Sequence, residues 1–236
     1  MSLTVTPVTD NREDPSIQAF AYTPDQLIAG VFPLVTSNAT ITGGAALVRG
    51  TVLGAVTVGT ATAAAKAGNT GNGTITGVSA QGNAATGVYK AIVEAAGTNA
   101  ATWNLYNPNG DLIDQKVYSG SGATAVFAND QIHATITDGA TDFVVGDEFD
   151  ITVVAGSGSY KMAVKTATDG SQIPCAILAD DTDASGGDVI GPLYLTGEFN
   201  SNAITLDTSF TLAAATAALR AYSIFLKSAV SAADPS

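Results

Sequence analysis

The segment that decides the fold is Tyr160–Asn200, YKMAVKTATDGSQIPCAILADDTDASGGDVIGPLYLTGEFN. Its alternating or continuous apolar residues predict three strands, at Tyr160–Lys165, Ile173–Leu178 and Val189–Gly197. The dipeptide Asp169-Gly170 predicts a hairpin between the first two, because both residues adopt positive φ at low cost. Pro174 has no N–H to donate to a ladder, so we expect it at the beginning of its strand. These strands should form the centre of the core.

The composition favours a β-rich, soluble protein over a disordered one. The chain has 236 residues, of which 46% are hydrophobic and 13% charged, enough for one large or two small domains. Its formal net charge is −12 and its nine Lys and Arg residues do not cluster, which argues against a nucleic-acid partner. No segment has the pattern of a secretory signal or a membrane span, so we expect no membrane partner.

The only cysteine, Cys175, excludes a disulfide within one chain, which fits synthesis in a reducing cytoplasm. A buried structural cysteine is favoured over a reactive thiol, because no neighbouring residue supplies a positive charge.

The middle of the chain has a strand pattern of its own. Short segments separated by Gly, Asn or Asp turns predict a small β-sandwich. Its strands are expected at Thr74–Ser79, Gly87–Ala95, Thr102–Asn107, Leu112–Tyr118, Ile132–Thr137 and Glu148–Val154. Its core aromatic residues are expected to be Tyr89, Trp103, Phe127, Phe143 and Phe149. The preceding segment Thr60–Gly73 is expected to be a linker or long loop, because it is rich in small residues, Gly and Asn.

Further elements are expected on either side of this middle segment. Strands are predicted at Val35–Thr42 and Leu47–Val58, with a turn at Gly43-Gly44. The Ala-rich segment Thr211–Ala221 predicts a helix with Thr208 or Ser209 as its cap, and Tyr222–Leu226 a short strand after it. Residues 1–20 predict an extended arm, which is either a frayed terminus or a segment that orders by adding a strand to a partner's sheet.

We expect no catalytic, metal-binding or cofactor-binding residues, and therefore no enzyme. The acidic loop with Asp180, Asp181, Asp183 and Asp188 lacks the ligand spacing of a calcium loop, so a solvated turn is favoured, as it is for GDEFD at Gly146–Asp150. His133 is the only histidine, which leaves a triad or a zinc site without its partners. Arg49 is either an arginine at the core's edge or part of an intersubunit pair.

Four stretches resemble the bacteriophage head decoration proteins, the family of the lambda capsid-stabilising protein. They are DGSQIPCAILADDTDASGGDVIGPLYLTGEFN at Asp169–Asn200, YTPDQLIAG at Tyr22–Gly30, GAALVRGTVLGAV at Gly44–Val56 and AALRAYSIFLK at Ala217–Lys227. The resemblance covers roughly residues 20–62 and 158–228. It implies a mainly β fold in which residues 1–20 are a capsid-binding arm. Residues 21–65 and 156–236 would be a discontinuous, β-clip-like body with a short C-terminal helix, and residues 66–155 an inserted β-sandwich.

The resemblance also implies a function. Made in the bacterial cytoplasm, the protein would decorate the outer surface of the expanded phage head as homotrimers at threefold positions. There it would clamp major capsid subunits against DNA pressure. The expected capsid-binding residues are Phe20, Tyr22, Leu27, Ile28 and Phe32. The insert would project outward, where it either contacts host surfaces or glycans or only adds bulk.

The alternative function is that of a carbohydrate- or host-surface-binding β module of a phage or extracellular adhesin. Such a module predicts independent domains in series. An insertion instead predicts that residues near 60 and 158 are adjacent.

Overall fold

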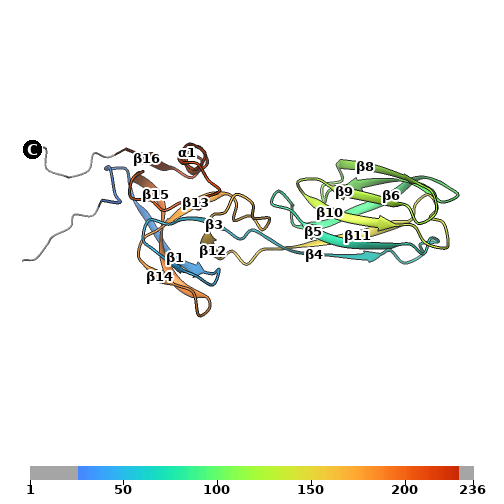
Figure 1. Ribbon diagram of the computed structural model, residues 1–236, viewed down its shortest axis with the longest axis horizontal. Helices are drawn as coiled ribbons and strands as arrows, with labels where there is room; N and C mark the ends of the chain where they lie inside the picture. Colours follow the sequence, from blue (N-terminus) through green and yellow to red (C-terminus); the bar gives the residue numbers. More distant parts are fainter. Residues whose placement is uncertain (1–25, 229–236) are drawn as a thin grey trace, which may run out of the picture.

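The computed structural model describes residues 26–228 and is mainly β, which confirms the expected fold class. Figure 1 shows an elongated molecule with two lobes. The strands before residue 57 and after residue 156 form one lobe, called the terminal lobe here (residues 26–56 and 156–228). The strands between them form the other, called the central lobe (residues 57–155).

The terminal lobe is built around a closed ring of strands. Its strands are β1 (Val35–Ile41), β2 (Ala46–Leu47), β3 (Val52–Ala55), β12 (Tyr160–Met162), β13 (Pro174–Leu178), β14 (Thr182–Asp183), β15 (Val189–Asn200) and β16 (Ile224–Lys227). The order β1-β12-β3-β13-β15 closes because β1 also pairs with β15. Strand β16 runs parallel to the end of β15, and β14 pairs with β2 as a separate ribbon. A closed ring leaves few unpaired edges.

The hairpin expected at Asp169-Gly170 is wrong. Strands β12 and β13 do not pair with each other, because β3 lies between them, with Tyr160 opposite Ala55 on one side and Ala176 opposite Leu53 on the other. The long connection from Met162 to Pro174 leaves room for β3 to enter. Pro174 is the first residue of β13, as expected.

Residues 26–228 contain one helix, α1 (Leu212–Arg220), which confirms the expected helix but not its cap. The N-cap is Thr211, whose side chain accepts the Ala214 N–H at 3.3 Å, whereas the Ser209 hydroxyl accepts the Lys165 N–H at 2.9 Å. The helix buries Ala215 and Leu219 against the terminal lobe. No helix in residues 26–228 is long and apolar enough to cross a membrane.

The central lobe contains two sheets that share one core. Its strands are β4 (Val58–Ala65), β5 (Thr74–Ala80), β6 (Gly87–Gly97), β7 (Ala100–Tyr106), β8 (Leu112–Ser119), β9 (Thr124–Ala128), β10 (Ile132–Thr137) and β11 (Glu148–Ala155). The five-stranded sheet has the order β4-β11-β6-β7-β8 and the three-stranded sheet the order β5-β10-β9. The five aromatic residues expected in the core are all at most 2% exposed, which confirms their role.

Two strands of the central lobe were not expected from the sequence. The linker predicted at Thr60–Gly73 is wrong in its first part, because β4 continues to Ala65 and pairs with β11. Strand β9 was also not predicted. Both segments consist largely of Ala, Thr and Val, and the ladder of a neighbouring strand stabilises them where their own side chains give little signal.

The two lobes are joined by two chain segments that lie side by side (Figure 1). The Val56 N–H donates to Ser159 O at 2.8 Å, and the Gly156 N–H donates to Thr57 O at 3.0 Å. The N–H groups of Thr57 and Val58 both donate to Asp169 O at 2.9 Å. The chain therefore leaves the terminal lobe and returns to it at one place.

Candidate functional site

The first described residues pair with the end of β15 through an isolated bridge. Ile28 forms an antiparallel bridge with Phe199. The Ala29 N–H donates to Glu198 O at 2.9 Å, and the Asn200 N–H donates to Leu27 O at 2.8 Å. Since β16 pairs with the same end of β15 on its other side, the first and last described segments share one strand as their support.

Three of the five expected capsid-binding residues lie in this segment. Leu27 is 2% exposed and packs in the core with Phe199, so it anchors the segment. Ile28 is half-buried, and Phe32 is 36% exposed with its ring edge-to-face against Phe225 at 5.2 Å between centroids. Phe20 and Tyr22 lie outside the described residues. Capsid contact by these five residues stays a prediction.

The segment that follows the anchor is apolar and exposed. Val31 is 100% exposed, Leu34 41% and Val35 49%. Together with Phe32 and Phe225 these residues form what is called the entry surface here. Burying a side chain of this type contributes about 1.5–3 kcal/mol. The entry surface therefore offers apolar area that a partner could cover.

Glu198 fixes the shape of the entry surface. Its carboxylate pairs with Lys227 Nζ at 2.7 Å and also accepts the N–H groups of Phe32 and Val31. The Lys227 contact is the main reason that the pKa of Glu198 is lowered. A Cβ on Gly30 would lie 1.5 Å from Glu198 Oε2, so any larger residue here would displace the Glu198 side chain.

Sequence reasoning missed Glu198, Lys227 and Phe225 as parts of this surface. A signal was present, because Gly30 and Glu198 each lie within a stretch that resembles the decoration proteins. Their contact joins residues far apart in the chain, which only the fold reveals.

The acidic loop around β14 is held by its own chain. Asp181 Oδ1 accepts the Arg49 N–H at 2.7 Å, and Arg49 Nε donates to Ala179 O at 2.9 Å. Asp183 accepts both the N–H and the O–H of Ser185. Arg49 thus bonds to the acidic loop of its own chain. Within residues 26–228, no group of three or more His, Cys, Asp and Glu side chains could hold a metal ion.

The solvated turn expected at GDEFD is wrong, because Asp147 and Glu148 are only 3% and 4% exposed. Asp147 accepts the N–H groups of Thr70, Gly71 and Val144 at 2.9–3.0 Å. Burial acts to raise the pKa of Glu148, but its bonds to Lys66 and Lys90 outweigh burial and lower that pKa to about 2. Both carboxylates hold the central lobe together.

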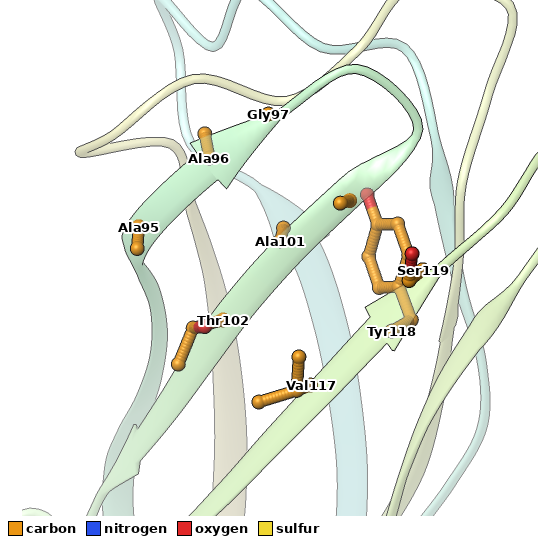
Figure 2. A pocket seen from close by; sticks show the side chains of 9 residues that line it. Ala95, Ala96, Gly97, Ala101, Thr102, Val117, Tyr118 and Ser119 are labelled. Atoms are coloured by element: carbon orange, nitrogen blue, oxygen red, sulfur yellow. The ribbon is translucent and has the colours of Figure 1, made fainter.

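The central lobe carries an open apolar hollow of about 250 Å³ over β6, β7 and β8 (Figure 2). The lining residues are Ala95, Ala96, Gly97, Ala100, Ala101, Thr102, Val117, Tyr118 and Ser119. Trp103 of β7 is fully buried on the inner face of this sheet, which confirms it as a core residue.

Residues 112–224 match the model of the family described as bacteriophage lambda head decoration protein D. This match confirms the family resemblance of the chain. It starts at the beginning of β8 and ends at Ile224, so the motifs at Tyr22–Gly30 and Gly44–Val56 lie outside it. A comparison with curated proteins found no match.

Two solved structures show a limited likeness to this chain. They are crystal structures of Xanthomonas campestris FlgL in space groups H3 and C2, each 21% identical to this chain. The TM-scores are 0.31 and 0.30, the alignments cover 48% and 46% of this chain, and they cover 34% and 33% of the FlgL chains. This chain thus spans about a third of the FlgL length, and a likeness of this size carries no argument about fold or function.

Proposed function

We propose, on the premise of the head decoration family match over residues 112–224, that the terminal lobe binds the outer surface of a phage capsid and stabilises it. The family is one of structural capsid proteins, which supports a mechanical rather than a catalytic role. The observation that carries the binding surface is the full exposure of Val31 in the entry surface.

The entry surface would face the capsid, and the central lobe would point away from it. In Figure 1 residues 26–34 and β16 lie on the side of the terminal lobe that is remote from the central lobe. Contact through that side leaves the central lobe free to project outward. This orientation supports the proposal that the terminal lobe attaches to the capsid while the central lobe is exposed.

The central lobe would be an insertion into a loop of the decoration-protein body. The support is the single crossing point, where Gly156 N–H donates to Thr57 O. Insertions succeed where the two ends lie close together at an exposed site. Because β4 pairs with β11, the insertion would extend from about residue 57 to residue 155, which is longer at its start than the 66–155 expected from the sequence.

On the capsid the protein would act as homotrimers at threefold positions, each clamping neighbouring major capsid subunits. After the first protomer binds, the second and third engage as intramolecular steps at high effective concentration. Many modest contacts would thereby raise the free energy needed to remove any one subunit. The net charge of −12 keeps the free protein soluble and disfavours binding to the packaged DNA.

The test is co-sedimentation with shells of the cognate major capsid protein, before and after expansion. We expect binding to expanded shells that saturates near one chain per capsid subunit. Removing residues 1–19 should weaken it, since the arm would add a strand to the capsid. Unchanged binding after this deletion would count against the arm, and absence of binding to both shell forms would refute the decoration role.

A substitution in the entry surface sharpens the test. Val31→Asp removes an apolar contact of about 1.5–3 kcal/mol and buries a charge, so we expect roughly tenfold weaker binding or more. The matched control is Val145→Asp, at a residue of the central lobe that is 64% exposed. If both variants bind shells as well as the unmodified protein does, the entry surface is not the attachment site.

A further inference from the structure

The outer face of the five-stranded sheet carries an ordered row of polar side chains. Gln115 Nε2 donates to Asn104 Oδ1 at 2.7 Å, and Asn104 Nδ2 donates to Tyr106 Oη at 3.3 Å. Asn104 is only 5% exposed although it lies on the outer face, so its neighbours hold it in place. Groups that are ordered before binding lose less conformational freedom when a ligand arrives.

The strand register places this polar row directly beside the apolar hollow. Ala95, Thr102 and Val117 are paired across β6, β7 and β8, and Figure 2 shows their side chains on the three neighbouring strands. Asn104 and Gln115 are the next pair on the same face, two residues along, which is about 7 Å. Amide groups and an apolar hollow therefore lie within the length of a short ligand.

The charges of the central lobe disfavour an anionic ligand. The lobe has three lysines and nine acidic residues. Lys66 and Lys90 both bind Glu148, at 2.5 and 2.6 Å, and Lys116 binds Asp114 at 3.0 Å. Each lysine is thus already paired within the lobe, and a polyanion would meet net negative charge.

We propose that this face binds an uncharged oligosaccharide that carries N-acetyl groups. The acetyl methyl group would occupy the hollow beside Val117, and the sugar amide and hydroxyl groups would bond to Gln115 and Tyr106, which the buried Asn104 holds in position. Sugar hydroxyls both donate and accept, which suits a row that presents amide N–H, amide oxygen and phenolic groups together. The hollow, the two side-chain amides and the Tyr106 phenol all lie along β7 and β8. A chain of sugars would therefore run along these strands.

The experiment is an NMR titration of the full-length, ¹⁵N-labelled protein with tri-N-acetylchitotriose, following the side-chain amide signals of Asn104 and Gln115. We expect both signals to shift in a saturable manner. Cellotriose, which has the same linkage without acetyl groups, should shift them far less, and heparin should leave them unchanged. No shift with tri-N-acetylchitotriose, or equal shifts with cellotriose or heparin, would overturn the proposal.

Variants locate the site. Val117→Lys fills the hollow and Gln115→Ala removes one amide, so each should weaken tri-N-acetylchitotriose binding by roughly tenfold or more. Val126→Lys, at a half-exposed residue of β9, is the matched control and should bind normally. Unchanged binding by both Val117→Lys and Gln115→Ala would refute the site. The titration uses no capsid, so its outcome is independent of the decoration role.

Discussion

The separate cores of the two lobes predict that each lobe unfolds as a unit of its own. Ile151 belongs to the core of the central lobe and Ile177 to that of the terminal lobe, and both side chains are 0% exposed. Replacing either isoleucine by alanine should destabilise the lobe that contains it. The other lobe should keep its stability, because the two isoleucines share no core cluster.

The size of the effect follows from burial. Since both side chains are fully buried, each substitution removes the whole transfer free energy of the lost carbons and leaves a cavity, at a cost of about 2–5 kcal/mol. With a urea dependence of about 1–3 kcal/mol per molar for a small protein, the unfolding midpoint should fall by roughly 1–2 M.

The chain contains one probe for each lobe. Trp103 is the only tryptophan and lies in the core of the central lobe, so its fluorescence follows that lobe. Cys175 is the only cysteine and lies in β13, so its reactivity with a thiol reagent follows the terminal lobe. We expect Ile151→Ala to shift only the Trp103 transition in urea, and Ile177→Ala to shift only the Cys175 transition.

The competing outcome is a single cooperative transition. The bonds from Thr57 and Val58 to Asp169 join the lobes and would transmit such coupling. If Ile177→Ala lowers the Trp103 midpoint as much as Ile151→Ala does, the lobes fold as one unit. The prediction that each lobe unfolds as a unit of its own would then be refuted.

Three further predictions concern single contacts. Because the pKa of Glu148 is lowered from 4.5 to about 2, its charged form stabilises the central lobe above pH 4.5, and that stability is lost as the pH falls toward 2. Glu148→Gln should therefore flatten the fall of the Trp103 urea midpoint over this range, and an unchanged pH profile would contradict the assignment. Thr211→Ala should lower the stability of the terminal lobe by about 1 kcal/mol through loss of the helix cap, measured by Cys175 reactivity in urea, whereas Thr216→Ala in the same helix should not. Gly170→Ala would place a Cβ 1.9 Å from Thr57 Oγ1 at φ +96°, whereas Gly158→Ala has φ +72° and meets nothing within 4 Å. Gly170→Ala should therefore lower the melting temperature more than Gly158→Ala does, and equal losses would show that the contact with Thr57 is unimportant.

Short-range patterns predicted most of the individual elements. The strand at Ile132–Thr137 has the expected bounds, the strand beginning at Leu112 is one residue longer than expected, and the helix before Tyr222 is one residue shorter at each end. These segments carry strong alternation or strong helix propensity, which act over a few residues. By contrast, β4 consists mostly of small residues, and its ladder with β11 stabilises it from a distant part of the chain.

The candidate attachment site was predictable only in part. Leu27, Ile28 and Phe32 stood out as apolar residues in a resembling motif, but the pattern does not tell which of them faces the core. In the structure Leu27 is buried, Phe32 is partly exposed and Val31 is fully exposed. The Glu198 carboxylate holds residues 30–32 in place by accepting the N–H groups of Val31 and Phe32. No local sequence pattern predicts this contact.

The amino-acid sequence alone was sufficient for the mainly β class, the aromatic core around Trp103 and the resemblance to the decoration proteins, because these depend on composition, local periodicity and motif order. Tertiary structure decided which strands pair, and so placed β3 between β12 and β13 in place of the expected hairpin. It also decided that Asp147 and Glu148 are buried, since a carboxylate can leave water only where partners such as Lys66 and Lys90 meet it. Such partners are brought together by the closing of the sheets, which depends on the whole chain.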